Sequence, residues 1–134
     1  MIENGLIFGH DGETLHWHLP VDRSSGYLPD RELEGADAWR QRHELVLWYY
    51  LKDHKDEIAG FAHSHPWNGR ASPSGIDLGT FRRIDKHLGV RFVWPIVTFT
   101  DVLYLRWHEE GQCYAPTDPV ALAGLGELRA RSRT

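Results

Sequence analysis

The stretch that decides the interpretation of this sequence runs from Ile58 to Asp77 and reads IAGFAHSHPWNGRASPSGID. It begins with a short apolar run, residues 58–63, which predicts a β-strand. A loop rich in Pro, Gly and Ser follows over residues 66–75. From Ser74 onward, apolar residues recur at steps of three and four, which predicts an amphipathic helix. The apolar positions on one face of that helix are Leu78, Phe81, Ile84 and Leu88.

Three side chains in this stretch have the spacing of metal ligands. His63 and His65 are alternate residues at the end of the predicted strand, so both imidazoles are expected on one face. The loop then returns Asp77, in the first turn of the helix, as an oxygen ligand. Three protein ligands leave one position for water, which is the arrangement of catalytic rather than structural zinc sites. Because two imidazoles favour zinc over magnesium, we predict that these residues bind one catalytic Zn²⁺.

Two ordinary interpretations compete with the metal site. His16-Trp-His18 has the same spacing, but no Ser-x-x-Asp follows it, and we predict that this pair lies on the outward face of a strand. Ser74 and Asp77 also fit the N-cap and N3 positions of a helix capping box. The order of the features nevertheless favours a metal site: a strand ending in His-x-His-Pro, a loop containing Gly and Pro, and Ser-x-x-Asp at the start of a helix.

The sequence before this stretch predicts a hairpin and a helix. Gly5 to Gly9 and Leu15 to Leu19 read as two strands joined by a turn. Residues 20–36 are rich in Pro, Gly and Ser and predict a loop, and loops this long in compact domains are often functional. From Asp37, a plausible N-cap, apolar residues recur at helical steps through Leu51, which predicts a helix of about five turns.

The sequence after this stretch predicts a second hairpin and a last helix. Phe92 to Thr100 and Val102 to His108 are β-rich and are joined at Thr100-Asp101. Pro95 in the first run indicates an edge strand or a bulge, because proline cannot donate a ladder hydrogen bond. Spaced apolar residues near the C-terminus predict a short helix; they are Val120, Leu122, Leu125 and Leu128. With no repeat and no long linker, residues 1–134 are predicted to form one α/β domain.

Bulk properties narrow the classes of function. A chain of 134 residues is long enough to bury a core without disulfides. The formal net charge of -4 argues against a general nucleic-acid binder, which would carry a basic face. Positive charge gathers only in a C-terminal group, which we interpret as a solvated terminus: Arg129, Arg131 and Arg133.

The single cysteine and the termini point to the cytoplasm. Cys113 excludes an intramolecular disulfide and fits a reducing compartment, and its place in a turn-like Gly-Gln-Cys-Tyr stretch argues against a nucleophile. The first residues show no basic region followed by an apolar run, so no signal peptide is predicted. No apolar stretch approaches the length of about 20 residues that spans a membrane.

The segment from His63 to Asp77 resembles the JAMM motif of the JAB1/MPN (Mov34/MPN/PAD-1) zinc metallopeptidases, in particular their short stand-alone prokaryotic members. That motif reads His-x-His-Pro, a loop, and Ser-x-x-Asp. The usual motif has ten residues between the second His and the Asp, whereas this chain has the eleven residues 66–76. The resemblance implies a JAB1/MPN-like (cytidine-deaminase-like) fold, a mixed β-sheet flanked by helices.

The resemblance also implies two catalytic residues. The family carries a catalytic Glu before the N-terminal apolar strand, as Glu-x-x-Gly; here Glu3 stands one residue closer to Gly5. Glu3 would accept a proton from water and pass it to the leaving amine, and Ser74 would stabilise the oxyanion. If Glu3 is out of register, either Glu13 or Glu57 could serve instead, or the protein could be inactive.

The activity implied by the resemblance is hydrolysis of a peptide or isopeptide bond at the C-terminal tail of a ubiquitin-like protein. Such a tail could lie along an edge strand, with Trp67 lining the approach. E1- and E2-like enzymes of the same pathway are the further partners implied. Two alternatives stay open: a hydrolase of small peptides or of sulfur-carrier adducts, and a RadC-like or MPN-like binding protein that has lost catalysis.

Overall fold

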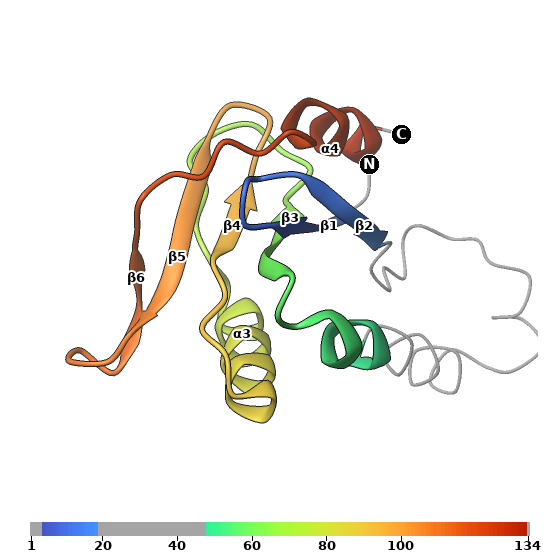
Figure 1. Cartoon of the computed structure of the whole chain (residues 1–134). Coiled ribbons are helices and arrows are strands. Elements are labelled where there is room, and N and C mark those ends of the chain that lie inside the picture. The colour runs from blue at the N-terminus through green and yellow to red at the C-terminus, as the bar shows by residue number, and fades with distance from the viewer. Residues whose placement is uncertain (1–3, 19–47, 134) are drawn as a thin grey trace, which may run out of the picture.

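The computed structural model describes residues 4–18 and 48–133 of the chain, and they are built around a six-stranded β-sheet (Figure 1). The strands lie in the order β2-β1-β3-β4-β5-β6. Within this sheet β3 and β4 pair in parallel, and the other neighbours pair antiparallel. The strands are β1 (Gly5–Gly9), β2 (Thr14–His18), β3 (Ile58–Ser64), β4 (Trp94–Val97), β5 (Val102–His108) and β6 (Cys113–Pro116). The helices are α3 (Gly75–Leu88), α4 (Leu125–Ser132) and residues 48–54.

Apolar clusters cover both faces of the sheet. On β1, Ile7 belongs to one cluster, whereas its neighbours Leu6 and Phe8 belong to another. Alternate residues of a strand point to opposite faces, so the two clusters lie on opposite sides of the sheet. The first includes residues of α3 and of the helix at 48–54, among them Leu51, Phe81, Ile84 and Leu88. The second includes residues of α4 and of the segment before it, Leu122 and Leu128. The predicted α/β class is therefore confirmed, with helices on both faces of a mixed sheet (Figure 1).

Several predicted elements are present as expected. β1 and β2 form the N-terminal hairpin, β4 and β5 form the second hairpin, and α3 begins directly after its N-cap. The predicted loop at 20–36 and most of the helix predicted from Asp37 lie outside the described residues. The last part of that predicted helix, from residue 48, is helical.

The prediction that Pro95 marks an edge strand or a bulge is wrong, because β4 lies inside the sheet between β3 and β5. The sheet tolerates the proline because its pairing with β3 is interrupted there. Gly60 bridges to Val93, and regular pairing resumes only at Ile96, so Pro95 falls between the two. Gly60 permits this close approach, since a Cβ atom built at residue 60 would lie 2.0 Å from the Val93 carbonyl oxygen.

The C-terminal part differs from the predicted pattern in two ways. Residues 113–116 form β6, an edge strand that the sequence did not reveal because it is short and half exposed. The last helix begins at Leu125, so Val120 and Leu122 lie in the segment before it, although Leu122 is still buried. Across residues 4–18 and 48–133, no helix combines the length and the apolar character that crossing a bilayer would require.

The prediction that the C-terminal arginines form a solvated terminus is wrong for Arg129 and Arg131, which are half-buried, whereas Arg133 is exposed. The guanidinium of Arg131 lies 4.1 Å from the ring centroid of Trp17, and that of Arg133 lies 4.6 Å from the ring centroid of Phe99. Arg129 donates from Nε to the carbonyl oxygen of Thr98 at 3.0 Å. These cation–π contacts and hydrogen bonds attach α4 to the sheet and to the β4–β5 turn.

The prediction for the His16-Trp-His18 pair is also wrong. The two imidazoles lie against aromatic rings, and His18 is buried. His16 stacks on Tyr50 with ring centroids 4.5 Å apart, and His18 meets Phe61 edge-on at 5.9 Å. Burial lowers the pKa of His16, and the nearby His54 lowers it further. His16 therefore packs against the helix at 48–54, and His18 packs against β3.

A buried carboxylate joins α3 to the sheet. Asp85 is 2% exposed and accepts hydrogen bonds from the Phe92 amide, from Trp94 Nε1 and, at 2.7 Å, from the Tyr114 hydroxyl. Burial raises the pKa of Asp85, and the hydrogen bonds offset only part of that effect. Burial and the contact with Asp85 together raise the pKa of Tyr114. One side chain of α3 thus holds the start of β4 and the edge strand β6.

We expect Asp85→Ala to lower the free energy of unfolding by about 3 kcal/mol, because two buried donors and one partly buried donor lose their acceptor. Urea unfolding followed by tryptophan fluorescence would measure the change. Asp118→Ala, which removes an exposed carboxylate, is the matched control and should stay within about 0.5 kcal/mol of the parent. Equal stability of the two variants would contradict this role for Asp85.

Candidate metal centre

β3 brings the two histidines to one side of the sheet. His63 pairs with Gly5 of β1 and with Ile96 of β4, and the amide of His65 still donates to the Val97 carbonyl at 2.8 Å. The Nε2 atoms of His63 and His65 are 3.0 Å apart. The sheet therefore holds the backbone of His63 on two sides and that of His65 through β4, which positions both imidazoles.

Ser64, between the two histidines, faces the other way, as expected from strand alternation. It is 1% exposed and accepts a hydrogen bond at 2.9 Å from the amide of Asn4. The Ser64 amide donates to the Asn4 carbonyl at 2.9 Å, and Ser132 of α4 donates to the Ser64 hydroxyl. The strand position that bears no ligand is thus attached to the chain before β1 and to α4.

α3 brings Asp77 to the histidines. Ser74 is the N-cap residue, and its hydroxyl accepts a hydrogen bond from the Asp77 amide at 3.0 Å. In return, the Ser74 amide donates to Asp77 Oδ2 at 3.0 Å. The capping box is therefore present, and it does more than begin the helix, because the Ser74 amide also orients the carboxylate of the third candidate ligand.

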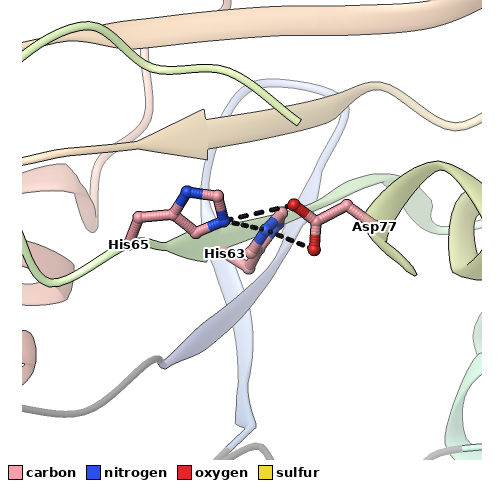
Figure 2. Close-up of side chains that lie close together, drawn as sticks. All are labelled: His63, His65 and Asp77. Carbon is pink, nitrogen blue, oxygen red and sulfur yellow. Dashed lines mark hydrogen bonds and ion pairs between the residues drawn. The ribbon is translucent and has the colours of Figure 1, made fainter. Parts of the chain in front are cut away.

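The three predicted ligands converge at one point (Figure 2). His63 Nε2 lies 3.3 Å from Asp77 Oδ1, and His65 Nε2 lies 3.2 Å from Asp77 Oδ2. One potential ligand atom from each residue lies within 4.8 Å of the others, so the three side chains could bind a metal ion together. Among residues 4–18 and 48–133, these three residues form the one group of at least three His, Cys, Asp or Glu side chains that are close enough together to hold a metal ion.

The charge of the site suits a cation. Burial by itself raises the pKa of Asp77, but hydrogen bonds from His63 and His65 outweigh it and hold the pKa of the carboxyl well below its usual range. The carboxylate is therefore ionised at neutral pH. The side chains of His65, His63 and Asp77 are 4%, 14% and 17% exposed, so a bound cation would be largely shielded from water on the protein side.

The loop that separates the ligands is attached to the β4–β5 turn by several hydrogen bonds. The Gly69 amide donates to Thr100 Oγ1 at 2.8 Å, and the Thr98 hydroxyl donates to the Gly69 carbonyl at 2.6 Å. The Ala71 amide donates to Asp101 Oδ2 at 2.7 Å. Gly69 has φ of 107°, which disfavours residues with a side chain. The eleven-residue loop is thus held in one conformation, although it is one residue longer than the motif it resembles.

Trp67 lies beside the metal centre. Its ring centroid is 4.4 Å from that of His65, and its carbonyl accepts a hydrogen bond from the Phe99 amide at 3.0 Å. The residue is 49% exposed, and Ile76, which precedes Asp77, is 83% exposed. Large apolar side chains therefore stand exposed next to two of the three candidate ligands.

None of the three glutamates predicted as a general base is placed beside the candidate metal centre by the described residues. Glu3 lies outside the described residues. Glu13 lies at the end of β1 that pairs with Ile58, because the Gly9 amide donates to the Glu13 carbonyl at 2.9 Å and Gly9 pairs with Ile58. Glu57 directly precedes Ile58, whereas His63 is at the other end of β3. At about 3.3 Å per residue, that separation is about 16 Å or more. The suggestion that Glu13 or Glu57 could serve as the base is therefore wrong.

The residues that sequence analysis missed are those that hold the ligands rather than bind the metal. Thr98, Thr100 and Asp101 were recognised only as parts of a strand and a hairpin turn. No periodicity shows that this turn contacts a loop about 30 residues away. The partnership of Asn4 with Ser64 is likewise a product of strand pairing across 60 residues.

Comparison with known proteins adds no family assignment. No family model matches the sequence, and no curated protein is similar enough to count as a match. The interpretation of the site therefore rests on its own geometry and on the motif.

We expect the chain to bind one divalent metal ion and His65→Ala to weaken that binding by more than about 100-fold, since even residues that only support a ligand contribute about 10- to 100-fold. Asp77→Asn should act in the same direction, because it removes the negative charge. Isothermal titration and elemental analysis would measure both. His87→Ala removes an imidazole of α3 outside the cluster, and an equal loss in that variant would contradict the assignment.

The attachment of the ligand loop makes a separate prediction. Asp101→Ala should weaken metal binding by about 10-fold, because the Ala71 amide loses its acceptor and the loop before Asp77 loosens. Asp101→Asn keeps an acceptor oxygen and should restore most of the affinity. Metal titration beside thermal unfolding would separate a local effect from general destabilisation, and unchanged affinity in Asp101→Ala would show that the loop does not need this contact.

Proposed function

We propose that this chain is a zinc-dependent metallopeptidase of the JAMM type that hydrolyses a peptide or isopeptide bond at the C-terminal tail of a ubiquitin-like protein. The observation that carries the proposal is the convergence of His63, His65 and Asp77 at the junction of a strand end and a helix start. The mixed sheet with helices on both faces is compatible with the JAB1/MPN-like fold that the motif implies.

The donor set and its spacing fit zinc. A tetrahedral ion with ligand distances of about 2.0–2.1 Å has ligand atoms about 3.3 Å apart. The two imidazole nitrogens are 3.0 Å apart, and they lie 3.3 Å from Asp77 Oδ1 (His63) and 3.2 Å from Asp77 Oδ2 (His65). Two imidazoles and one carboxylate also suit zinc better than magnesium or calcium, which prefer oxygen ligands. His63, His65 and Asp77 would hold the zinc, which would supply an activated water as the nucleophile at neutral pH.

Two residues would work on the substrate beside the metal. The Ser74 hydroxyl accepts from the Asp77 amide, which leaves its own hydrogen to be donated to the oxygen of the carbonyl under attack. Glu3 would accept the proton of the attacking water and deliver it to the leaving amine as the C–N bond breaks. Glu3 precedes Asn4, and Asn4 hydrogen-bonds to Ser64 between the two histidines, which supports this assignment.

The surroundings of the site support an extended peptide as substrate. Trp67 and Ile76 offer exposed apolar surface beside His65 and Asp77. The resemblance adds the ubiquitin-like tail as the source of that peptide. A small-peptide or sulfur-carrier-adduct hydrolase would use the same catalytic residues, and a binding protein without catalysis would keep the metal ligands alone.

We expect the zinc-loaded chain to cleave a ubiquitin-like protein from a reporter fused to its C-terminal tail, with product masses that place the cut at the end of the tail. Glu3→Gln should lower kcat by about 100-fold or more, because proton transfer is lost. Ser74→Ala should lower kcat by about 100- to 1000-fold if its hydroxyl stabilises the oxyanion. Mass spectrometry and steady-state kinetics would measure these effects.

Matched controls separate the alternatives. Glu13→Gln changes a carboxylate at the far end of β1 and should keep full activity. Cleavage of short peptide amides but not of the fusions would favour the small-peptide hydrolase. Zinc binding without cleavage of any probe, with Glu3→Gln identical to the parent, would reject the enzyme and favour a binding protein.

A further inference from the structure

A second concave site lies at the opposite end of β3 from the metal centre. A cleft of about 340 Å³ opens where the start of β3 meets the connection from α3 to β4. Its apolar lining includes Ala59, Val90 and Val93, which are partly exposed, with Ile58 and Phe92 buried beneath them at 3% and 2% exposure. Ile58 and His63 are five residues apart on a strand, which corresponds to about 16 Å. The cleft is therefore separate from the cluster of candidate metal ligands.

Basic side chains gather around this cleft. Lys55, Arg91, Arg106 and His10 all line it, and no acidic residue does. Arg91 forms an ion pair with Glu109, with 2.6 Å between Arg91 Nη2 and Glu109 Oε2. Within residues 4–18 and 48–133, Lys55 and Arg106 form no ion pair with a carboxylate. Two uncompensated cations beside one cleft are notable in a chain whose formal net charge is -4.

Hydrogen bonds hold part of this basic rim in place. Arg106 donates from Nε to the Arg91 carbonyl at 3.2 Å, which fixes the guanidinium while its two terminal nitrogens remain available. His10 Nε2 lies 3.0 Å from the Asp56 carbonyl, which ties the β1–β2 turn to the segment that carries Lys55. A guanidinium held by its Nε presents parallel N–H groups that match two oxygens of a phosphate.

We propose that this cleft binds a small organic phosphate monoester, with the phosphate at Lys55 and Arg106 and an apolar or aromatic group against the partly exposed Ala59, Val90 and Val93. A dianionic phosphate matches these two cations, which have no ion pair among the described residues, better than a single carboxylate does. The volume falls within the range of about 300–1,000 Å³ that is usual for small-molecule sites. The accessible apolar lining gives an organic phosphate an advantage over the inorganic ion. This proposal does not depend on the metallopeptidase activity.

The test is a titration of the isotope-labelled chain followed by amide NMR, with phenyl phosphate, inorganic phosphate and phenol as probes. Phenyl phosphate should give saturable shifts at the amides of residues 58, 59 and 90–93, and it should bind at least about fivefold tighter than either of the other probes. Arg106→Gln and Lys55→Gln should each weaken its binding by about fivefold or more, because each removes one charge-assisted hydrogen bond.

Two controls make the outcome decisive. Arg83→Gln removes an exposed arginine of α3 that does not line the cleft, and it should leave binding within about twofold. Asp77→Asn disables the candidate metal centre and should also leave binding unchanged, so failure of one site is distinguishable from failure of the other. The proposal is overturned if no probe saturates, if inorganic phosphate binds as well as phenyl phosphate, if all variants bind alike, or if the shifts centre on residues 63–65.

Discussion

The hydrogen bonding of β3 to strands on both sides is the constraint on which the rest of this structure depends. At His63 the strand pairs with Gly5 on one side and with Ile96 on the other, so the backbone cannot rotate or slip there. A slip of one residue would turn both imidazoles to the face where Ser64 is buried. The apolar clusters on the two faces oppose such a slip, because it would expose buried side chains.

The third candidate ligand is held by local and by long-range contacts. The Ser74 capping box fixes the Asp77 carboxylate relative to the start of α3. The β4–β5 turn holds the loop before it through Gly69 and Ala71, and α4 in turn holds that turn through Arg129. Farther along α3, Asp85 fastens the helix to β4 and β6. A site of three side chains thus draws on most of the described fold for its geometry, as metal centres require.

The two ends of β3 lie beside candidate binding sites of opposite charge. The end at His63 and His65 gathers two imidazoles and an ionised carboxylate, which suit a cation. The end at Ile58 borders a cleft with basic side chains, which suit an anion. Because the strand between them is rigid and paired, a ligand at either end meets a surface that is already formed. Preorganisation of this kind reduces the entropy that binding would otherwise cost.

The sequence by itself determined the candidate ligands, the strand and helix that carry them, the N-cap of α3 and the α/β class, because each depends on residues close together in the chain. His-x-His on a strand and Ser-x-x-Asp at a helix start have a spacing that local backbone geometry makes meaningful. Only the tertiary structure decided that Pro95 lies inside the sheet and that His16, Arg129 and Arg131 are packed. It also decided that Glu13 and Glu57 are far from the candidate metal centre. It also brought Asp101 to the ligand loop and assembled the basic cleft. These outcomes depend on which strands pair and in what register, and strand pairing joins residues up to about 60 positions apart that no local pattern connects.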